Sequence, residues 1–162
     1  MMLVLVVMAI TFAAAYVVGW AITLRVMKAD IRKTEDRETE EKHFAELMDR
    51  LDGFSQLKDG WNGYDAVPPG ESVNAARGIV ARNGAHRMYG WEVFPTGRSS
   101  VQLERTVRDA YTEIEVYCDH VVVFREVKHF LYTESTEVSI PLSDHRKIDR
   151  VIRKGEWMPW MY

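Results

Sequence analysis

The sequence predicts an α+β protein with an N-terminal transmembrane helix. After that helix we expect a charged helical stalk and then a small domain, in which two or three helices pack an antiparallel β-meander of about four or five strands. Three observations carry this prediction: an uncharged run, then a charged segment without proline, then short segments of alternating polarity. The expected parts are the transmembrane helix over 1–24, the juxtamembrane stalk over 25–57, the domain over 58–155 and an aromatic C-terminal tail over 156–162.

Residues 1–24 contain no charged side chain, which favours a single-pass membrane helix. At about 1.5 Å per residue, a helix of this length matches the roughly 30 Å hydrocarbon thickness of a bilayer. The main alternative is a cleaved signal peptide, and the alanines at 13–15 would suit cleavage. A signal peptide, however, has a basic stretch before its apolar run, and this chain has none.

The charges beside this run predict its orientation. Basic residues follow it directly, and no basic side chain precedes it. Because Lys and Arg are retained on the cytoplasmic side, we expect a short N-terminus outside and residues 25–162 in the cytoplasm. The predicted location is therefore the inner (cytoplasmic) membrane of the cell. The flanking basic residues are Arg25, Lys28, Arg32 and Lys33.

The stalk is predicted to be one helix, since residues 25–57 contain no proline and a single glycine. Its second half places apolar residues on one helical face. This stripe either packs on the chain's own domain or forms a coiled coil that makes a homo-oligomer. It spans barely two heptads, and coiled coils usually have three or four, which favours packing. The stripe consists of Phe44, Leu47, Met48, Leu51 and Phe54.

Two helices are expected within the domain. The first covers 71–84, with Ser72 as its N-cap and Gly84 as its end. The second covers 143–155, with Ser143 as its N-cap and basic residues in its last turn. The inner face of the first helix is formed by Val73, Ala76, Ile79 and Val80.

Between these helices, apolar and polar residues alternate along short segments joined by tight turns, which is typical of an antiparallel meander with one buried face. The alternation places Val107 and Cys118 on the buried face together with the other apolar strand positions. The expected strands are 88–94, 101–107, 110–118 and 121–127, with weaker candidates at 130–134 and 136–140.

The segment LKDGWNGYDAVPP, residues 57–69, combines two glycines, two aromatic residues and a proline pair. Asp59, Asn62 and Asp65 offer oxygen ligands of the kind that calcium and magnesium prefer. Counted from Asp59, however, the chain lacks the acid, the glycine and the glutamate of an EF-hand loop at its third, sixth and twelfth positions. We therefore expect no metal in this segment.

We expect the same segment to be a rigid corner. Gly60 and Gly63 permit positive φ, and Asp and Asn side chains can hold turn backbone. Trp61 and Tyr64 would then pin the corner to the sheet or to the next helix. The alternative is a recognition loop. Its contact residues would be Trp61, Asn62, Tyr64 and Asp65.

The stretch GWNGYDAVPP, from Gly60 to Pro69, resembles the motif G-W-[D/N]-G-Y-x-A-x-P-P of a family of uncharacterised small bacterial and phage-encoded proteins. In that family a helix follows the proline pair, and then strands around P-T-x-G, V-Q-L-E and E-I-E-V. Here these pieces are Pro95–Gly97, Val101–Glu104 and Glu113–Val116, in the same order. The resemblance spans residues 57–118 and implies a bacterial or phage origin and a helix followed by a meander. It implies no activity, so no catalytic residue is carried over.

Glu104 and Glu113 are further candidates, because they lie on the polar face of adjacent predicted strands. Paired carboxylates can act as acid and base when burial separates their pKa values. Alternating glutamates on a solvated sheet face are, however, what an ordinary meander shows. Arginines near the aromatic residues, such as Arg98 and Arg105, leave open a surface on which a nucleotide could stack.

The sequence carries no catalytic or metal-binding signature. The five histidines lack the spacing of a zinc site, and the single Cys118 excludes an intrachain disulfide. There is no phosphate-binding loop, dinucleotide fingerprint or nucleophile elbow. The net charge of −3 gives no argument for a nucleic-acid partner. We expect no catalytic residue, no metal and no cofactor.

These observations favour a non-enzymatic module that is anchored in the lipid bilayer through residues 1–24 and binds an unknown protein partner. One alternative is a small-ligand or nucleotide sensor, or an enzyme, that uses the 59–65 loop and the polar sheet face. Another is an oligomerising structural phage or envelope protein. The candidate ligand- or partner-binding residues are Trp61, Asn62, Tyr64, Asp65, Glu104 and Glu113.

Overall fold

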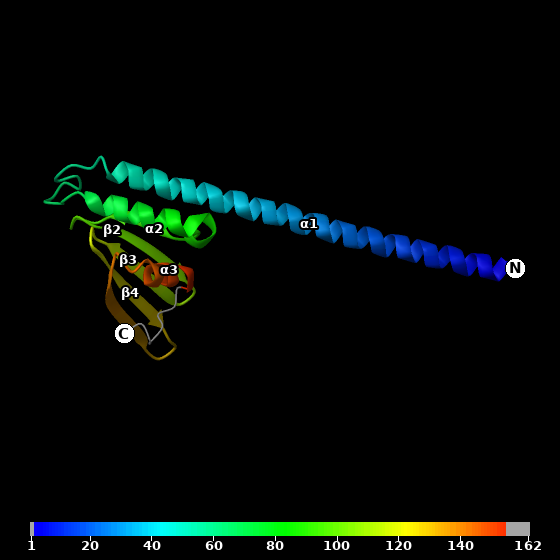
Figure 1. Cartoon of the computed structure of the whole chain (residues 1–162). Coiled ribbons are helices and arrows are strands. Elements are labelled where there is room, and N and C mark those ends of the chain that lie inside the picture. Colours follow the sequence, from blue (N-terminus) through cyan, green and yellow to red (C-terminus); the bar gives the residue numbers. More distant parts are fainter. Residues whose placement is uncertain (1, 155–162) are drawn as a thin grey trace. The chain divides into compact units, whose positions relative to one another are not determined.

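The computed structural model describes the backbone of residues 2–154 and most of their side chains; the side chains of residues 1–19, 21, 22, 24, 26 and 154 and all of residues 155–162 lie outside the description. Within residues 2–154 the chain forms an α+β fold, as predicted (Figure 1). The elements are α1 (Met2–Phe54), α2 (Glu71–Met88), β1 (Glu92–Pro95), β2 (Val101–Val107), β3 (Ala110–Val116), β4 (His120–Lys128), β5 (Thr133–Pro141) and α3 (His145–Lys154).

The chain divides into two compact units, residues 1–39 and residues 40–162. α1 contributes to both, and the division falls inside the segment expected as the stalk. The second unit holds the last turns of α1, the sheet, α2 and α3. The aromatic tail expected over 156–162 lies outside the described residues.

In the part of the chain that the structure describes, no helix is long and apolar enough to cross a membrane. The transmembrane helix expected over 1–24 falls mainly on side chains outside the described residues. There α1 supplies a helical backbone from Met2 onward. The membrane helix therefore stays a prediction.

The five strands form one antiparallel sheet in the order β1-β2-β3-β4-β5, which confirms the predicted meander. Neighbouring apolar positions align across the sheet, as Leu103 with Ile114 and Ile114 with Val123. Each is 3% exposed or less, so these rows form the buried face. The expected alternation between buried and exposed side chains holds only where helices cover the strands. Val107, at the end of β2, is 47% exposed, and Cys118 is exposed in the turn after β3, so their expected burial was wrong.

Several strand boundaries differ from the prediction; β3, for example, ends at Val116 and not at 118. The strand expected over 88–94 begins only at Glu92, because α2 runs to Met88 and Gly90 turns the chain with a φ of 79°. The two weak strands expected over 130–134 and 136–140 are one strand, β5. Its long pairing with β4 makes a hairpin whose turn lies at residues 129–132.

The expected helix caps were wrong at both starts. Gly70 occupies the N-cap of α2, and Ser72 Oγ instead donates a hydrogen bond to the Ser99 carbonyl at 2.8 Å. At α3, Asp144 rather than Ser143 accepts from the Lys147 N–H, at 3.3 Å. Gly84 does break α2, with a φ of 70° and a ψ of 173°, but a further helical turn follows it.

The core lies between the buried face of the sheet and one face of each helix. The expected inner residues of α2 are all buried, from Val73 to Val80. The apolar stripe of α1 packs into the same core, with Leu47 1% and Leu51 0% exposed. The stripe therefore packs on the chain's own domain, which was one of its two expected roles; the other was a coiled coil.

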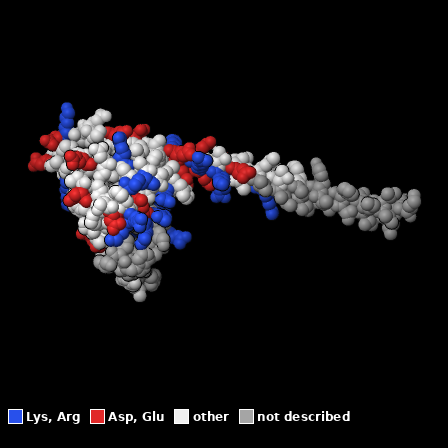
Figure 2. All heavy atoms as spheres, viewed as in Figure 1, with Lys and Arg blue, Asp and Glu red and all other residues white. Residues whose placement is uncertain are grey.

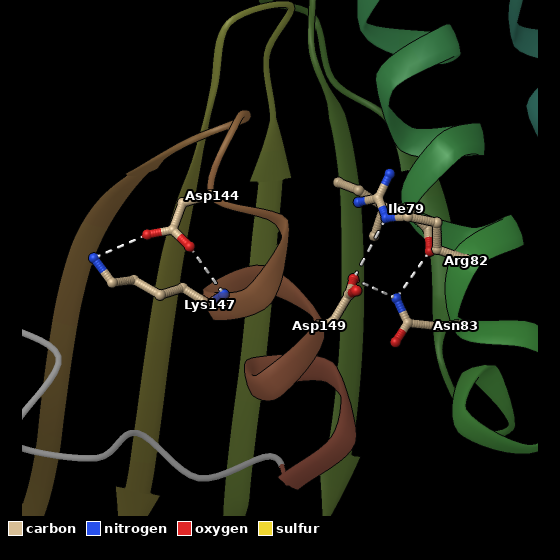
Figure 3. A network of polar contacts seen from close by, with 6 residues as sticks. All are labelled: Ile79, Arg82, Asn83, Asp144, Lys147 and Asp149. Carbon is tan, nitrogen blue, oxygen red and sulfur yellow. Dashed lines mark hydrogen bonds and ion pairs between the residues drawn. The ribbon is translucent and has the colours of Figure 1, made fainter.

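α2 and α3 are also joined by polar contacts (Figure 3). The Asn83 amide donates to the Ile79 carbonyl at 2.9 Å and to Asp149 Oδ1 at 3.0 Å. Arg82 lies 3.7 Å from the same carboxylate oxygen. A buried amide is costly without partners, so this pairing fixes where α3 lies against α2.

We expect Leu51→Ala to lower the free energy of unfolding by about 2–5 kcal/mol, because it leaves a cavity in the core. Ile31→Ala is the matched control, since Ile31 is 59% exposed on the same helix and its loss should change stability by less than about 0.5 kcal/mol. Guanidinium unfolding of the full chain in detergent, followed by circular dichroism, measures both. Equal stability of the two variants would contradict the packing of the stripe.

Candidate functional site

The candidate site is the face of the sheet that points away from the core. Side chains alternate along a strand, so the residues between the buried positions share this second face. The buried side chains of all described helices join the cluster on the opposite face. We call the second face the outer face. On the central strands it carries Gln102, Glu104, Tyr111, Glu113 and Phe124.

Tyr111 lies between two carboxylates of the outer face. Glu104 is opposite Glu113 in the pairing of β2 with β3, which brings two negative charges to neighbouring positions. The Tyr111 hydroxyl oxygen lies 2.9 Å from Glu104 Oε2 and 2.8 Å from Glu113 Oε2. A hydroxyl has one hydrogen to donate. Gln102 Nε2, which donates to Glu104 Oε2 at 3.0 Å, satisfies that carboxylate when the hydroxyl serves Glu113.

This arrangement keeps the phenol protonated. Burial, followed by the hydrogen bonds to Glu113 and Glu104 and their charges, raises the pKa of Tyr111 above its usual range. A phenolate would lose the donor and add a third negative charge beside two others. Tyr111 therefore acts as a clamp that, together with the Gln102 amide, holds the two carboxylates in place.

Glu115, the next outer-face glutamate on β3, is also held by a hydrogen bond. Ser100 is fully buried and its Oγ lies 2.6 Å from Glu115 Oε1 and 2.5 Å from Thr96 Oγ1. Burial, and then the hydrogen bond to Glu115, raise the pKa of the Tyr117 phenol. The outer face thus presents negative charge at defined positions, because its carboxylates are held by hydroxyl and amide donors.

The 57–69 segment is a hydrogen-bonded corner. The Gly60 N–H donates to the Ala66 carbonyl at 2.9 Å, and the Gly63 N–H donates to the Gly60 carbonyl at 2.9 Å. Both glycines have positive φ, 70° and 83°, as expected. Asn62 Oδ1 accepts from the Tyr64 N–H at 3.0 Å, which is the turn contact that an Asn side chain offers. Ala66 closes the corner at 4% exposure.

The two aromatic residues of the corner behave differently. Trp61 is half-buried, with its Nε1 hidden from solvent, and its pinning of the corner to the sheet or to α2 stays a prediction. Tyr64 is 82% exposed, and the expectation that it pins the corner was wrong. It directly follows Gly63, whose φ is positive. Asn62 and Asp65 are exposed beside it.

The structure brings together only part of the predicted site. Glu104 and Glu113 meet at Tyr111, and Asn62 contacts the backbone of Tyr64. No interaction between described residues joins the 59–65 loop to either glutamate. The 57–69 segment instead pairs, through Val67, with the chain around Gly97: the Val67 N–H donates to the Gly97 carbonyl at 3.2 Å.

A cluster of basic residues lies elsewhere in the second unit and was missed at the sequence level. It lines a hollow of about 450 Å³ together with Tyr89 and Glu40. Its members come from the last turn of α2, from β2 and from the last turn of α3, which only the folded chain brings together. We call it the basic cluster. It consists of His86, Arg87, Arg105 and Arg153.

Comparison with protein-family models, with curated proteins and with solved structures gives no match. Among the described residues no three His, Cys, Asp or Glu side chains gather as the ligands of a metal ion would.

We expect Tyr111→Phe to lower the free energy of unfolding by about 1 kcal/mol at neutral pH, because a half-exposed hydrogen bond to a charged acceptor is lost. The raised pKa adds a pH dependence: the stabilisation is complete below the unfolded pKa of about 10 and is lost as the pH rises beyond it. Above that pH the native chain should lose stability faster than the variant. Denaturant unfolding at a series of pH values below and above about 10 tests this pH dependence, with Tyr132→Phe at an exposed position as the control. Parallel pH curves would contradict the clamp.

Proposed function

We propose that this protein is a single-pass membrane protein whose second unit lies in the cytoplasm and binds a protein partner without catalysing a reaction. The support for the anchor is the uncharged run over 1–24 and the basic residues, from Arg25 to Lys33, that follow it. The resemblance of Gly60–Pro69 to bacterial and phage-encoded proteins fits an inner-membrane location.

The observation that carries the binding proposal is the outer face. The rings of Tyr111 and Phe124 lie on it with their centroids 6.4 Å apart, next to the fixed carboxylates of Glu104 and Glu113. Aromatic residues surrounded by polar groups are typical of protein interfaces. The partner segment that fits has Lys or Arg beside apolar side chains, since such a segment complements both the charge and the rings.

Binding is favoured over catalysis because the carboxylates already have donors. Glu104 and Glu113 accept hydrogen bonds from Gln102 and Tyr111, and an acid–base pair needs a proton that can move to a substrate. The sensor or enzyme alternative joins the outer face with the 59–65 loop, and the described contacts do not bring these together. The coiled-coil alternative draws on Leu47 and Leu51, which lie in the core.

We expect the full chain in lipid nanodiscs to bind a fluorescent peptide with alternating Lys and Leu more tightly than its Glu-Leu counterpart. The double variant Glu104→Gln, Glu113→Gln keeps the shape of the face and removes its charge, and should weaken binding by about tenfold or more. Glu38→Gln, Glu46→Gln is the matched control on exposed positions of α1. Fluorescence anisotropy measures all three proteins. Equal affinity for both peptides, or equal loss in both variants, would sink the proposal.

The anchor can be tested with a natural reporter, because Cys118 is the single cysteine of the chain and is exposed. In a bacterial host, a membrane-impermeant maleimide should label Cys118 only after the inner membrane is opened. The companion variant Met2→Cys, Cys118→Ser should be labelled while that membrane is intact. Mass spectrometry reads both out. Labelling of Cys118 behind an intact inner membrane would contradict the cytoplasmic placement.

A further inference from the structure

One end of the sheet presents apolar side chains to solvent. The turn between β4 and β5, residues 129–132, carries Phe130 at 99%, Leu131 at 86% and Tyr132 at 61% exposure. We call it the hairpin tip. Three adjacent exposed side chains of this kind usually mark a surface that binds a protein, a ligand or a membrane.

The hairpin tip is a fixed structure and not an extended loop. The His129 N–H donates to the Tyr132 carbonyl at 2.8 Å, and the His129 and Tyr132 rings stack with their centroids 4.4 Å apart. These two contacts close the turn at its base. Phe130 and Leu131 are the two residues between them, and their side chains are exposed.

The neighbouring turn lies at the same end. The Lys128 N–H donates to the Asp109 carbonyl at 2.8 Å, which ties the β2–β3 turn to the base of the hairpin tip. That turn adds Val107, which is 47% exposed, and the exposed Arg108. Apolar and basic side chains therefore stand together at this edge of the sheet.

The basic cluster belongs to the same end, because Arg105 precedes Val107 by two residues on β2. His86 is held by Glu40 at 2.9 Å, and Glu40 is the single carboxylate of the lining. Among the described residues no ion pair neutralises Arg87, Arg105 or Arg153. Figure 2 shows Lys and Arg side chains gathered on this part of the second unit.

We propose that this end of the second unit docks on the surface of an anionic lipid bilayer. Phe130 and Leu131 enter the boundary between headgroups and acyl chains, and Tyr132 lies at headgroup level, as aromatic rings with a polar group do. The arginines of the basic cluster bind lipid phosphates, for which the guanidinium has matching geometry. A free phosphate would use the cluster but leave the hairpin tip in water. A bilayer occupies both, and this is why we assign it.

This surface is separate from the outer face and does not depend on the protein partner proposed above. A membrane anchor in the same chain would strengthen it, since tethering raises the effective concentration of the bilayer around the second unit. The contact would then hold the second unit at the membrane surface instead of leaving it free in the cytoplasm.

The test places an environment-sensitive fluorophore on the hairpin tip, in the full chain with Leu131→Cys and Cys118→Ser. The protein is reconstituted into vesicles of phosphatidylcholine alone, or of phosphatidylcholine and phosphatidylglycerol in equal parts. We expect blue-shifted emission and quenching by brominated lipid only with phosphatidylglycerol. A fluorophore on the native Cys118 is the control, because the β3–β4 turn lies at the opposite end of the sheet, and it should stay in water.

Arg105→Gln, Arg153→Gln should lower the docking equilibrium constant by roughly thirtyfold, as expected for two basic residues at an anionic surface. The matched control is the double variant Arg98→Gln, Arg146→Gln, which removes the same charge from exposed positions outside the basic cluster. It should change the docking equilibrium constant little. Circular dichroism verifies that each variant is folded. A hairpin tip that stays in water on both membranes overturns the proposal. So does equal insertion on both membranes, loss of the signal on adding soluble glycerol phosphate, or a signal that appears only with a peptide partner. None of these results would change the labelling pattern that tests the anchor.

Discussion

The burial of Leu47 and Leu51 is the interaction on which the rest of the second unit depends. These side chains fill the core between α1, α2 and the sheet, and each is 1% exposed or less. Removing either leaves a cavity that the surrounding side chains cannot fill, which is costly in a small core. The last turns of α1 are therefore part of the second unit. A shortened chain that begins at residue 58 would lack one wall of its core.

One-sided burial also decides where function can lie. All described helices send their buried side chains to the same face of the sheet, so the meander keeps a free outer face. On that face the register of a two-residue turn sets Glu104 opposite Glu113, and like charges there would repel. The Tyr111 hydroxyl offsets part of the repulsion by donating its one hydrogen bond to Glu113, while Gln102 donates to Glu104. The same clamp that offsets this repulsion also fixes the negative charge of the face at defined positions.

The alternation of apolar and polar residues predicted those parts of the fold that follow from a regular repeat along the chain. The alternation around Leu103 and Ile114 identified the strands and their buried face, and the tight turn between them indicated that Glu104 and Glu113 are neighbours. The same alternation could not predict features that depend on local backbone geometry or on contacts between distant parts of the chain. The exposure of Tyr64 beside the half-buried Trp61 is not indicated by the residue types of that segment. The Tyr111 clamp needs side-chain positions, and the basic cluster needs two helix ends and a strand to meet, so neither has a signature in sequence spacing.

The small net charge of −3 conceals a separation of charge within the second unit. Carboxylates gather on the outer face, and guanidinium groups gather at the end of the sheet beside the hairpin tip. An anionic bilayer attracts that end and repels the outer face. Docking through the basic cluster would therefore leave Glu104 and Glu113 off the lipid surface. A basic partner segment would then meet the face that the membrane repels, so the two proposed contacts assist each other without sharing a residue.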